Sequence, residues 1–122
     1  MKLLIVDDSS IVRRTILRSI EVAGIEQVFE ASNGRQALQI FEAEQPDLVT
    51  MDITMPEMDG LSCVSRIIDR HPEARILVIS ALGDEATAME AVERGANGYV
   101  YKPFTPEELN EAFAELLASP SS

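Results

Sequence analysis

The apolar residues fall into short, nearly continuous runs that alternate with longer amphipathic stretches. Three of these runs, 3–6, 48–51 and 76–79, have the length of a strand and are almost wholly apolar. Such runs are typical of parallel strands that are buried on both faces of a sheet. Two more polar runs, 27–31 and 98–101, are expected to form edge strands. The pattern therefore predicts three central strands and two at the edges.

Between the strands, apolar positions recur at helical spacing and predict four helices. Their stripes are Ile16, Ile20 and Ala23; Ala37, Leu38 and Phe41; Leu61, Val64, Ile67 and Ile68; and Met89, Val92 and Ala96. We expect Gly24 to stop the first helix and Asn33 to cap the second. The third helix is expected to end before Pro72, because a proline disfavours helical backbone in the residue before it.

A fifth helix has the clearest start signal. Thr105 and Glu108 have the spacing of a capping box, and Pro106 occupies the first helical position between them. Apolar residues then follow at helical spacing: Leu109, Ala112, Phe113, Leu116 and Leu117.

The order strand–helix, repeated five times, predicts an open parallel sheet with helices on both faces, because crossovers between parallel strands are right-handed. With the two more polar runs at the edges, the strand order 2-1-3-4-5 fits best. This is a flavodoxin-like, doubly wound (βα)5 α/β fold. We expect residues 1–118 to form one domain and residues 119–122 to form a flexible tail.

Composition narrows the functional classes. The 122 residues include 10 Lys and Arg against 21 Asp and Glu, a formal net charge of -11. This charge argues against nucleic acid or membrane partners and suits cations or basic protein surfaces. No apolar run approaches the ~18 residues of a membrane span, and the N-terminus lacks the pattern of a signal peptide, so a cytoplasmic location is expected.

Cysteine and histidine occur once each, which excludes an internal disulfide and argues against a Cys- or His-based metal site. We interpret Cys63 as a partly buried, unreactive thiol. We interpret His71 as a solvated residue that interacts with the dipole at a helix C-terminus.

Polar residues cluster where the predicted strands end. Asp7 and Asp8 follow the first strand, Asp52 the third, Ser80 the fourth and Lys102 the fifth. Taken singly, each has an ordinary explanation as a helix cap, a loop acid, a turn residue or a surface lysine. In sheets of this kind, however, ligands bind outside the carboxyl ends of the strands. The joint placement of these side chains on neighbouring strands therefore favours a functional site.

Three carboxylates at one edge of a sheet repel one another, and this repulsion must be offset. Two carboxylates about 5 Å apart repel by roughly 3 kcal/mol at an effective dielectric constant of about 20. A bound cation or a retained proton relieves this repulsion, and an all-oxygen donor set favours Mg²⁺ or Mn²⁺. With Lys102 opposite, the arrangement permits phosphoryl transfer to a carboxylate. Asp52 is the best-placed nucleophile because its strand is central, whereas Asp7 and Asp8 are better placed to hold the metal.

At these residues the chain resembles the receiver domain of response regulators, and among its members the stand-alone, chemotaxis-type regulators. The resemblance covers residues 2 to about 117. The segments that carry it are LLIVDDS at 3–9, MDITMPEMDG at 51–60, SA at 80–81 and GANGYVYKPF at 95–104. Several separated motifs in the same order make the resemblance specific.

The resemblance implies which residues form the phosphorylation site. Asp52 matches the phosphoacceptor. Mg²⁺, with Mn²⁺ as a substitute, would be held by the side chains of Asp8 and Asp52 and by the backbone carbonyl of Thr54. Asp7 matches the second acid, which acts largely through a metal-bound water. Lys102 matches the lysine that contacts the phosphoryl group.

The resemblance also implies a switch. Ser80 matches a hydroxyl that moves toward the phosphoryl group, and Tyr99 matches an aromatic ring that turns inward when the hydroxyl moves. Lys102 and Pro103 match a peptide bond that is usually cis, a form that is less costly before proline.

The function that follows from the resemblance is a signalling switch in a two-component or phosphorelay system. A histidine kinase or a histidine phosphotransfer domain would supply the phosphoryl group. The chain would be no dedicated enzyme, but it would catalyse its own Mg²⁺-dependent phosphorylation and dephosphorylation. The face made by the fourth helix, fifth strand and fifth helix would then change affinity for a target protein, with the chain monomeric or dimerising on phosphorylation. Arg13, Arg14 and Arg18 form either a solvated basic face or a docking surface for the phosphodonor.

Two other classes stay open. An aspartate-nucleophile phosphatase would place a second acid two residues after the nucleophile, where this chain has Thr54. A nucleotide or flavin binder would place glycine after the first strand, where this chain has two acids and two serines. Within the family, a receiver cut from a DNA-binding regulator or a methylesterase would look much like a stand-alone chemotaxis or motility regulator.

Overall fold

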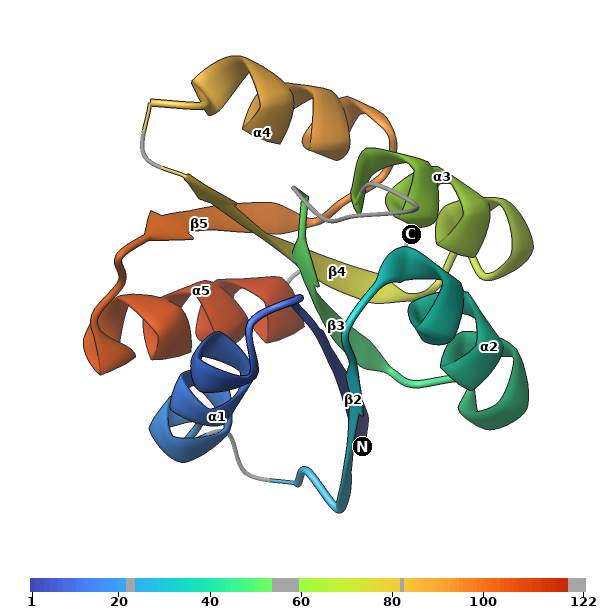
Figure 1. The fold of residues 1–122 in the computed structure, drawn as a ribbon, viewed down its shortest axis with the longest axis horizontal. Coiled ribbons are helices and arrows are strands. Elements are labelled where there is room, and N and C mark those ends of the chain that lie inside the picture. The colour runs from blue at the N-terminus through green and yellow to red at the C-terminus, as the bar shows by residue number, and fades with distance from the viewer. Residues whose placement is uncertain (22–23, 54–59, 82, 119–122) are drawn as a thin grey trace.

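A computed structural model describes residues 1–21, 24–53, 60–81 and 83–118. Within these ranges, five parallel strands form one sheet in the order β2-β1-β3-β4-β5 (Figure 1). Their bounds are β1 (Lys2–Val6), β2 (Gln27–Ala31), β3 (Leu48–Asp52), β4 (Arg75–Ala81) and β5 (Gly98–Lys102). The predicted fold class and strand order are therefore confirmed, and the two more polar strands lie at the edges.

Helices cover both faces of the sheet (Figure 1). On one face lie α1 (Ser10–Ser19) and α5 (Pro106–Ala118); on the other lie α2 (Gly34–Glu44), α3 (Gly60–Arg70) and α4 (Glu85–Glu93). Successive strand residues point to opposite faces, so the sheet separates two apolar cores. Leu3 and Phe113 belong to the core under α1 and α5, whereas Leu4 and Phe41 belong to the other. No helix in the described ranges has the length and apolar character that a bilayer span requires.

Three helices, α1, α2 and α5, begin where a side chain accepts a hydrogen bond from a free backbone amide. Thr105 and Glu108 form the predicted capping box, with both N···O distances at 3.1 Å, and Asn33 caps α2. Ser9, rather than Asp8, caps α1 by accepting a backbone N–H of that helix at 3.3 Å. The Asp8 carboxylate is therefore not used as the cap of α1.

α1 ends at Ser19, earlier than the expected stop at Gly24. The reason lies in α5, where Nδ2 of Asn110 donates to the Ser19 carbonyl oxygen at 2.7 Å. A side chain from another helix thus satisfies a terminal carbonyl that a further turn of α1 would otherwise have satisfied. Ala23, which belongs to the predicted stripe of this helix, lies outside the described residues, as does the predicted tail at 119–122.

α4 is present, but the stripe predicted for it is not its buried face. Ala88 and Ala91 are fully buried, whereas Met89 is 50% exposed and Ala96 lies beyond the end of the helix. Small alanine side chains allow the helix to lie close to its neighbours, and the larger methionine is left at the surface. The predicted stripe is therefore partly wrong: it includes the buried Ala96, but it turns Met89 inward and leaves out Ala88 and Ala91.

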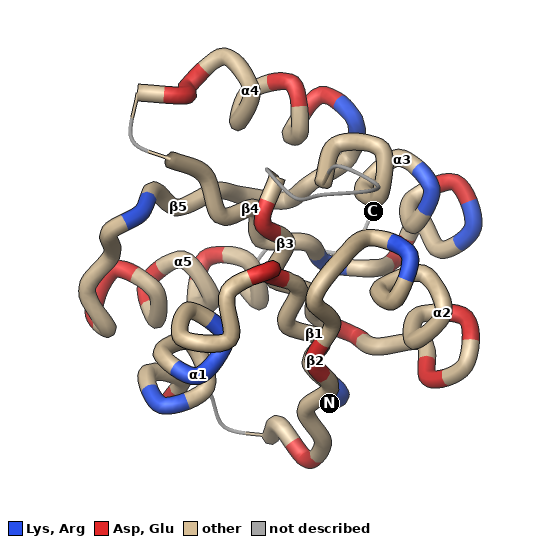
Figure 2. The backbone as a smooth tube through the Cα atoms, viewed as in Figure 1, with Lys and Arg blue, Asp and Glu red and all other residues tan. Residues whose placement is uncertain are grey.

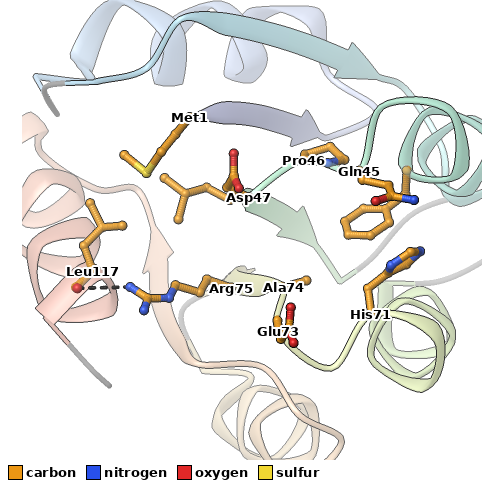
Figure 3. A pocket seen from close by; sticks show the side chains of 11 residues that line it. Met1, Gln45, Pro46, Asp47, His71, Glu73, Ala74, Arg75 and Leu117 are labelled. Carbon is orange, nitrogen blue, oxygen red and sulfur yellow. Dashed lines mark hydrogen bonds between the residues drawn. The ribbon is translucent and has the colours of Figure 1, made fainter. Parts of the chain in front are cut away.

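The interpretation of His71 as a solvated residue is wrong. Its ring packs against Phe41, with ring centroids 4.8 Å apart, and its Nε2 atom is buried. Both rings line a pocket of about 610 Å³ that also contains Asp47, Arg75 and Leu117 (Figure 3). Asp47 precedes β3 and Arg75 begins β4, so this pocket lies at the amino edge of the sheet. It is therefore separate from the carboxyl edge, where the predicted site residues lie.

Candidate functional site

The strand register brings two of the predicted acids together. Met51 of β3 pairs with Val6 of β1, and Asp52 pairs with Ile79 of β4. Asp7, which directly follows Val6, therefore lies beside Asp52 at the carboxyl edge of the sheet. Figure 2 shows acidic backbone positions at the ends of β1 and β3.

Three carboxylates converge at this edge. One oxygen each from Asp7, Asp8 and Asp52 can be chosen so that all three lie within 4.8 Å of one another. Asp7 is fully buried and Asp52 is 4% exposed, whereas Asp8 is exposed. The cluster is therefore open to water on the side of Asp8 and closed on the side of the sheet.

Lys102 supplies a positive charge at the cluster. Its Nζ lies 3.0 Å from Oδ2 of Asp7 and 3.6 Å from Oδ2 of Asp52. Oδ2 of Asp7 makes no directed hydrogen bond within the described residues, so its contact with Lys102 is an ion pair. The peptide bond between Lys102 and Pro103 is cis. The ammonium contacts two of the three carboxylates, and the negative charge that remains at the cluster suits a divalent cation with oxygen ligands.

Backbone contacts hold the loop that carries Asp7. The Asp7 amide donates to the Ala31 carbonyl at 3.1 Å, which extends the pairing of β1 with β2 by one residue. The Ser9 amide donates to Oδ1 of Asp7 at 2.9 Å, which leaves Oδ2 to face Lys102. The orientation of the Asp7 carboxylate is therefore set by groups on both sides.

Gly60, which the sequence analysis did not single out, positions Asp52. A Cβ at Gly60 would clash with the carbonyl oxygen of Asp52 and with Cα of Ile53. The Gly60 amide also donates to the Ile53 carbonyl at 3.3 Å. The start of α3 thus lies directly against the end of β3, and only a residue without a side chain fits there.

Ser80 lies at the same edge, but its hydroxyl faces the segment after β4. The residue is 1% exposed, and its Oγ lies 3.4 Å from the Ala81 carbonyl oxygen and 3.5 Å from that of Asp84. Both distances are long for hydrogen bonds of a hydroxyl. Ser80 is therefore held weakly in this position. Thr54, the predicted source of a metal-binding carbonyl, lies outside the described residues.

Two tyrosines lie on one face of β5. Tyr99 is 42% exposed, and its ring centroid lies 5.4 Å from that of Tyr101. Tyr101 pairs with Ser80 in the register of β4 and β5, which places the aromatic pair next to the hydroxyl. Partial burial raises the pKa of the Tyr101 hydroxyl above its ordinary 10.0, and Tyr99, Glu85 and Asp84 add to this shift. Tyr101 is therefore neutral at physiological pH.

Comparison with known proteins agrees with this geometry. The chain matches the family model of the response regulator receiver domain over residues 3–114. It is 43% identical over 111 residues to the chemotaxis protein CheY of Thermotoga maritima, a match that covers 91% of this chain and 92% of that protein. It is 40% identical over 116 residues to CheY of Bacillus subtilis, covering 95% of this chain and 97% of that protein.

A solved structure shows the same architecture. A chain of the CheX-CheY-BeF3-Mg complex from Borrelia burgdorferi superposes with a TM-score of 0.90 at 30% identity, covering 98% of this chain and 90% of that chain. The stretch matched by the family model contains Asp7, Asp8, Asp52 and Lys102, the four residues that converge at the carboxyl edge. The chain therefore belongs to the family of response regulator receiver domains.

Proposed function

We propose that this chain is a phosphorylation-driven switch in which Asp52 accepts a phosphoryl group. The observation that carries the proposal is the carboxylate cluster, in which Asp7, Asp8 and Asp52 can each place an oxygen within 4.8 Å of the others. Lys102 faces two of these acids. Asp52 is the candidate nucleophile because it ends the middle strand of the sheet, between the other two acids and β4.

Mg²⁺ fits the donor set of this cluster. The side-chain donors are all carboxylate oxygens, and the excess of acids over ammonium groups needs a cation. Asp7, Asp8 and Asp52 would hold the ion, the backbone carbonyl of Thr54 would add a further oxygen, and Mn²⁺ would serve as a substitute. When bound, the ion would offset charge on the oxygens of the phosphoryl group.

The transfer step is an in-line displacement. A carboxylate oxygen of Asp52 attacks phosphorus, the bond between phosphorus and the histidine nitrogen of the donor breaks, and the nitrogen keeps the electron pair. The product is an acyl phosphate, and later attack of water on phosphorus releases phosphate and restores the carboxylate. Lys102, 3.6 Å from Oδ2 of Asp52, lies within reach of oxygens on that phosphorus. The chain thus acts on its own aspartate and is no dedicated enzyme.

Ser80 and Tyr99 are the proposed switch. The two long contacts of the Ser80 hydroxyl, 3.4 and 3.5 Å, are weaker than a hydrogen bond to a charged phosphoryl oxygen. Phosphorylation would therefore draw the hydroxyl away from the segment after β4. The ring of Tyr99, now 42% exposed, would turn inward toward the volume that the hydroxyl leaves.

The proposed phosphodonor is a histidine kinase or a histidine phosphotransfer domain that docks over α1. Ile11 is 75% exposed and Leu17 is 44% exposed on this helix, and Arg14 and Arg18 are exposed beside them. An apolar surface bordered by positive charge suits a helical partner with an acidic rim.

The proposed output surface is the face of α4, β5 and α5, which would bind a target protein in the cytoplasm. Residues 82–122 carry eight acidic and two basic side chains, and Figure 2 shows acidic positions along α4 and α5. Met89 and Tyr99 expose apolar area on the same face. These features fit a target with a basic rim and an apolar centre, and the same face would serve a dimer formed on phosphorylation.

Intact-mass spectrometry after incubation with acetyl phosphate and Mg²⁺ tests the proposal. We expect one added phosphoryl group in the wild-type chain, none in Asp52→Asn and none after chelation of the metal. Labelling of Asp52→Asn to the wild-type level would show that Asp52 is not the acceptor. Sustained turnover of a phosphate ester such as p-nitrophenyl phosphate would instead favour a phosphatase.

A further inference from the structure

Arg13 differs from the other arginines of α1. Arg14 and Arg18 are exposed, whereas the side chain of Arg13 is only 17% exposed and turns back toward the end of β1. Its Nη1 donates to the Asp7 carbonyl oxygen at 2.6 Å, and its Nε donates to Oε1 of Glu30 at 3.0 Å. One guanidinium therefore ties α1 to the end of β1 and to the edge strand β2.

The Asp7 carbonyl is part of the peptide unit that joins Asp7 to Asp8. Rotation of this unit changes ψ of Asp7 and φ of Asp8, and so moves the two carboxylates relative to each other. The amide and side chain of Asp7 are held by Ala31 and Ser9, at 3.1 and 2.9 Å. The contact from Arg13 holds the peptide unit that leads into the exposed Asp8.

We infer that Arg13 is a positioning residue, which holds the Asp7–Asp8 peptide so that both carboxylates stay directed toward one divalent cation with Asp52. The inference rests on the metal site proposed above. A charged donor makes a stronger hydrogen bond than a neutral one, and the burial of Arg13 limits competition from water. The planar guanidinium also donates in two directions at once, which a lysine ammonium in the same place does less well.

The charge of Arg13 and its positioning role have opposite effects on the affinity of the site for a divalent cation. A guanidinium near an acidic cluster opposes a second cation, so its removal strengthens the attraction for a divalent ion. Removal also leaves the Glu30 carboxylate without its partner and makes the region more negative. Charge alone therefore predicts tighter metal binding without Arg13, whereas positioning predicts weaker binding. Whether the affinity for the metal rises or falls on removal of Arg13 therefore distinguishes a charge effect from a positioning effect.

The affinity of the full chain for Mn²⁺ can be measured by titration, with the electron paramagnetic resonance signal of the free ion as the readout. The change in this affinity between the wild type and each variant gives the required sign. We expect Arg13→Met to weaken Mn²⁺ binding by about tenfold, the size of loss typical when a partner of a metal ligand is removed. Arg13→Lys keeps the charge and reaches fewer acceptors, so its affinity is expected to fall between Arg13→Met and the wild type. Arg14→Met is the matched control, since it removes the same charge from an exposed neighbour, and it is expected to bind like the wild type.

Circular dichroism at the assay temperature shows which variants are folded. Wild-type or tighter affinity in folded Arg13→Met would overturn the inference. If Arg13→Met does not fold, Arg13→Lys decides alone: weaker binding supports the positioning role and wild-type affinity overturns it. Failure of the metal site itself has a different signature, because the wild type would then bind no Mn²⁺, or Asp8→Asn would bind it equally well.

Discussion

Nζ of Lys102 lies 3.0 Å from Oδ2 of Asp7, although their strands are separated in the sheet by β3 and β4. The lysine side chain therefore passes over the end of β3, where Asp52 lies 3.6 Å from the ammonium. This geometry places a cation against the buried side of the carboxylate cluster and leaves the side of Asp8 open.

We expect Lys102→Met to separate metal binding from phosphoryl transfer. Loss of the ammonium makes the cluster more negative, so Mn²⁺ should bind at least as tightly as in the wild type. Transfer from acetyl phosphate should slow by about 100-fold or more, because a charge contact to the phosphoryl oxygens is lost. The free-ion resonance signal gives the affinity and intact-mass spectrometry gives the rate. A parallel loss of both would show that Lys102 only supports the shape of the site.

Gly60→Ala should destabilise the chain even though alanine is the better helix former. The new Cβ would meet backbone atoms of Asp52 and Ile53, which cannot move aside as a flexible side chain can. We expect a loss of about 2 kcal/mol or more in the free energy of unfolding, measured by urea denaturation. Gly98→Ala is the control, since its Cβ would make an ordinary 3.6 Å contact with Leu77. Equal midpoints for the two variants would contradict the close packing of α3 against β3.

Asn110→Ala tests the contact between α5 and the end of α1. The variant loses the bond to the Ser19 carbonyl at 2.7 Å and the bond from the Glu21 amide at 2.9 Å. We expect a cost of about 1–2 kcal/mol in urea denaturation, with faster amide exchange at the end of α1. Glu111→Ala changes the exposed neighbouring position and should leave the midpoint nearly unchanged. If Asn110→Ala unfolds at the same urea concentration as the wild type, water replaces both contacts.

The raised pKa of Tyr101 can be observed directly, because the chain has two tyrosines and no tryptophan. Tyrosinate absorbance in Tyr99→Phe should rise at a pH above 10.0, since partial burial and the acids Glu85 and Asp84 disfavour the charged form. The folded pKa exceeds the unfolded value, so the stability that Tyr101 contributes is present below the unfolded pKa and is lost as the pH rises through the folded one. A pKa of Tyr101 at or below 10.0 in Tyr99→Phe, with the fold intact by circular dichroism, would contradict this environment.

The strand order could be predicted because buried parallel strands have continuous apolar runs, and because right-handed crossovers leave few arrangements. Convergence of Asp7, Asp8 and Asp52 followed from the same reasoning, since the carboxyl ends of neighbouring strands meet at one edge. The capping box of Thr105 and Glu108 was equally predictable, because its partners are only three residues apart.

The features that the sequence did not indicate depend on contacts between side chains and distant backbone atoms. Arg13 has the same residue type as the exposed Arg14, and hydropathy does not reveal that it reaches the Asp7 carbonyl. The packing of His71 against Phe41 is another such contact, because no residue near His71 along the chain indicates Phe41 as its partner. Gly60 carries no chemistry of its own, and its role appears only when the start of α3 is placed against Asp52.

Location of the phosphoryl group tests the central claim most directly. After reaction with acetyl phosphate and Mg²⁺, borohydride reduces an aspartyl phosphate to homoserine, and peptide mass spectrometry then locates the reduced residue. The proposed function predicts a single reduced position, Asp52, which is lost when the metal is chelated and absent in Asp52→Asn. Reduction at Asp7 or Asp8, or no reduced residue in a chain that binds Mn²⁺, would contradict it.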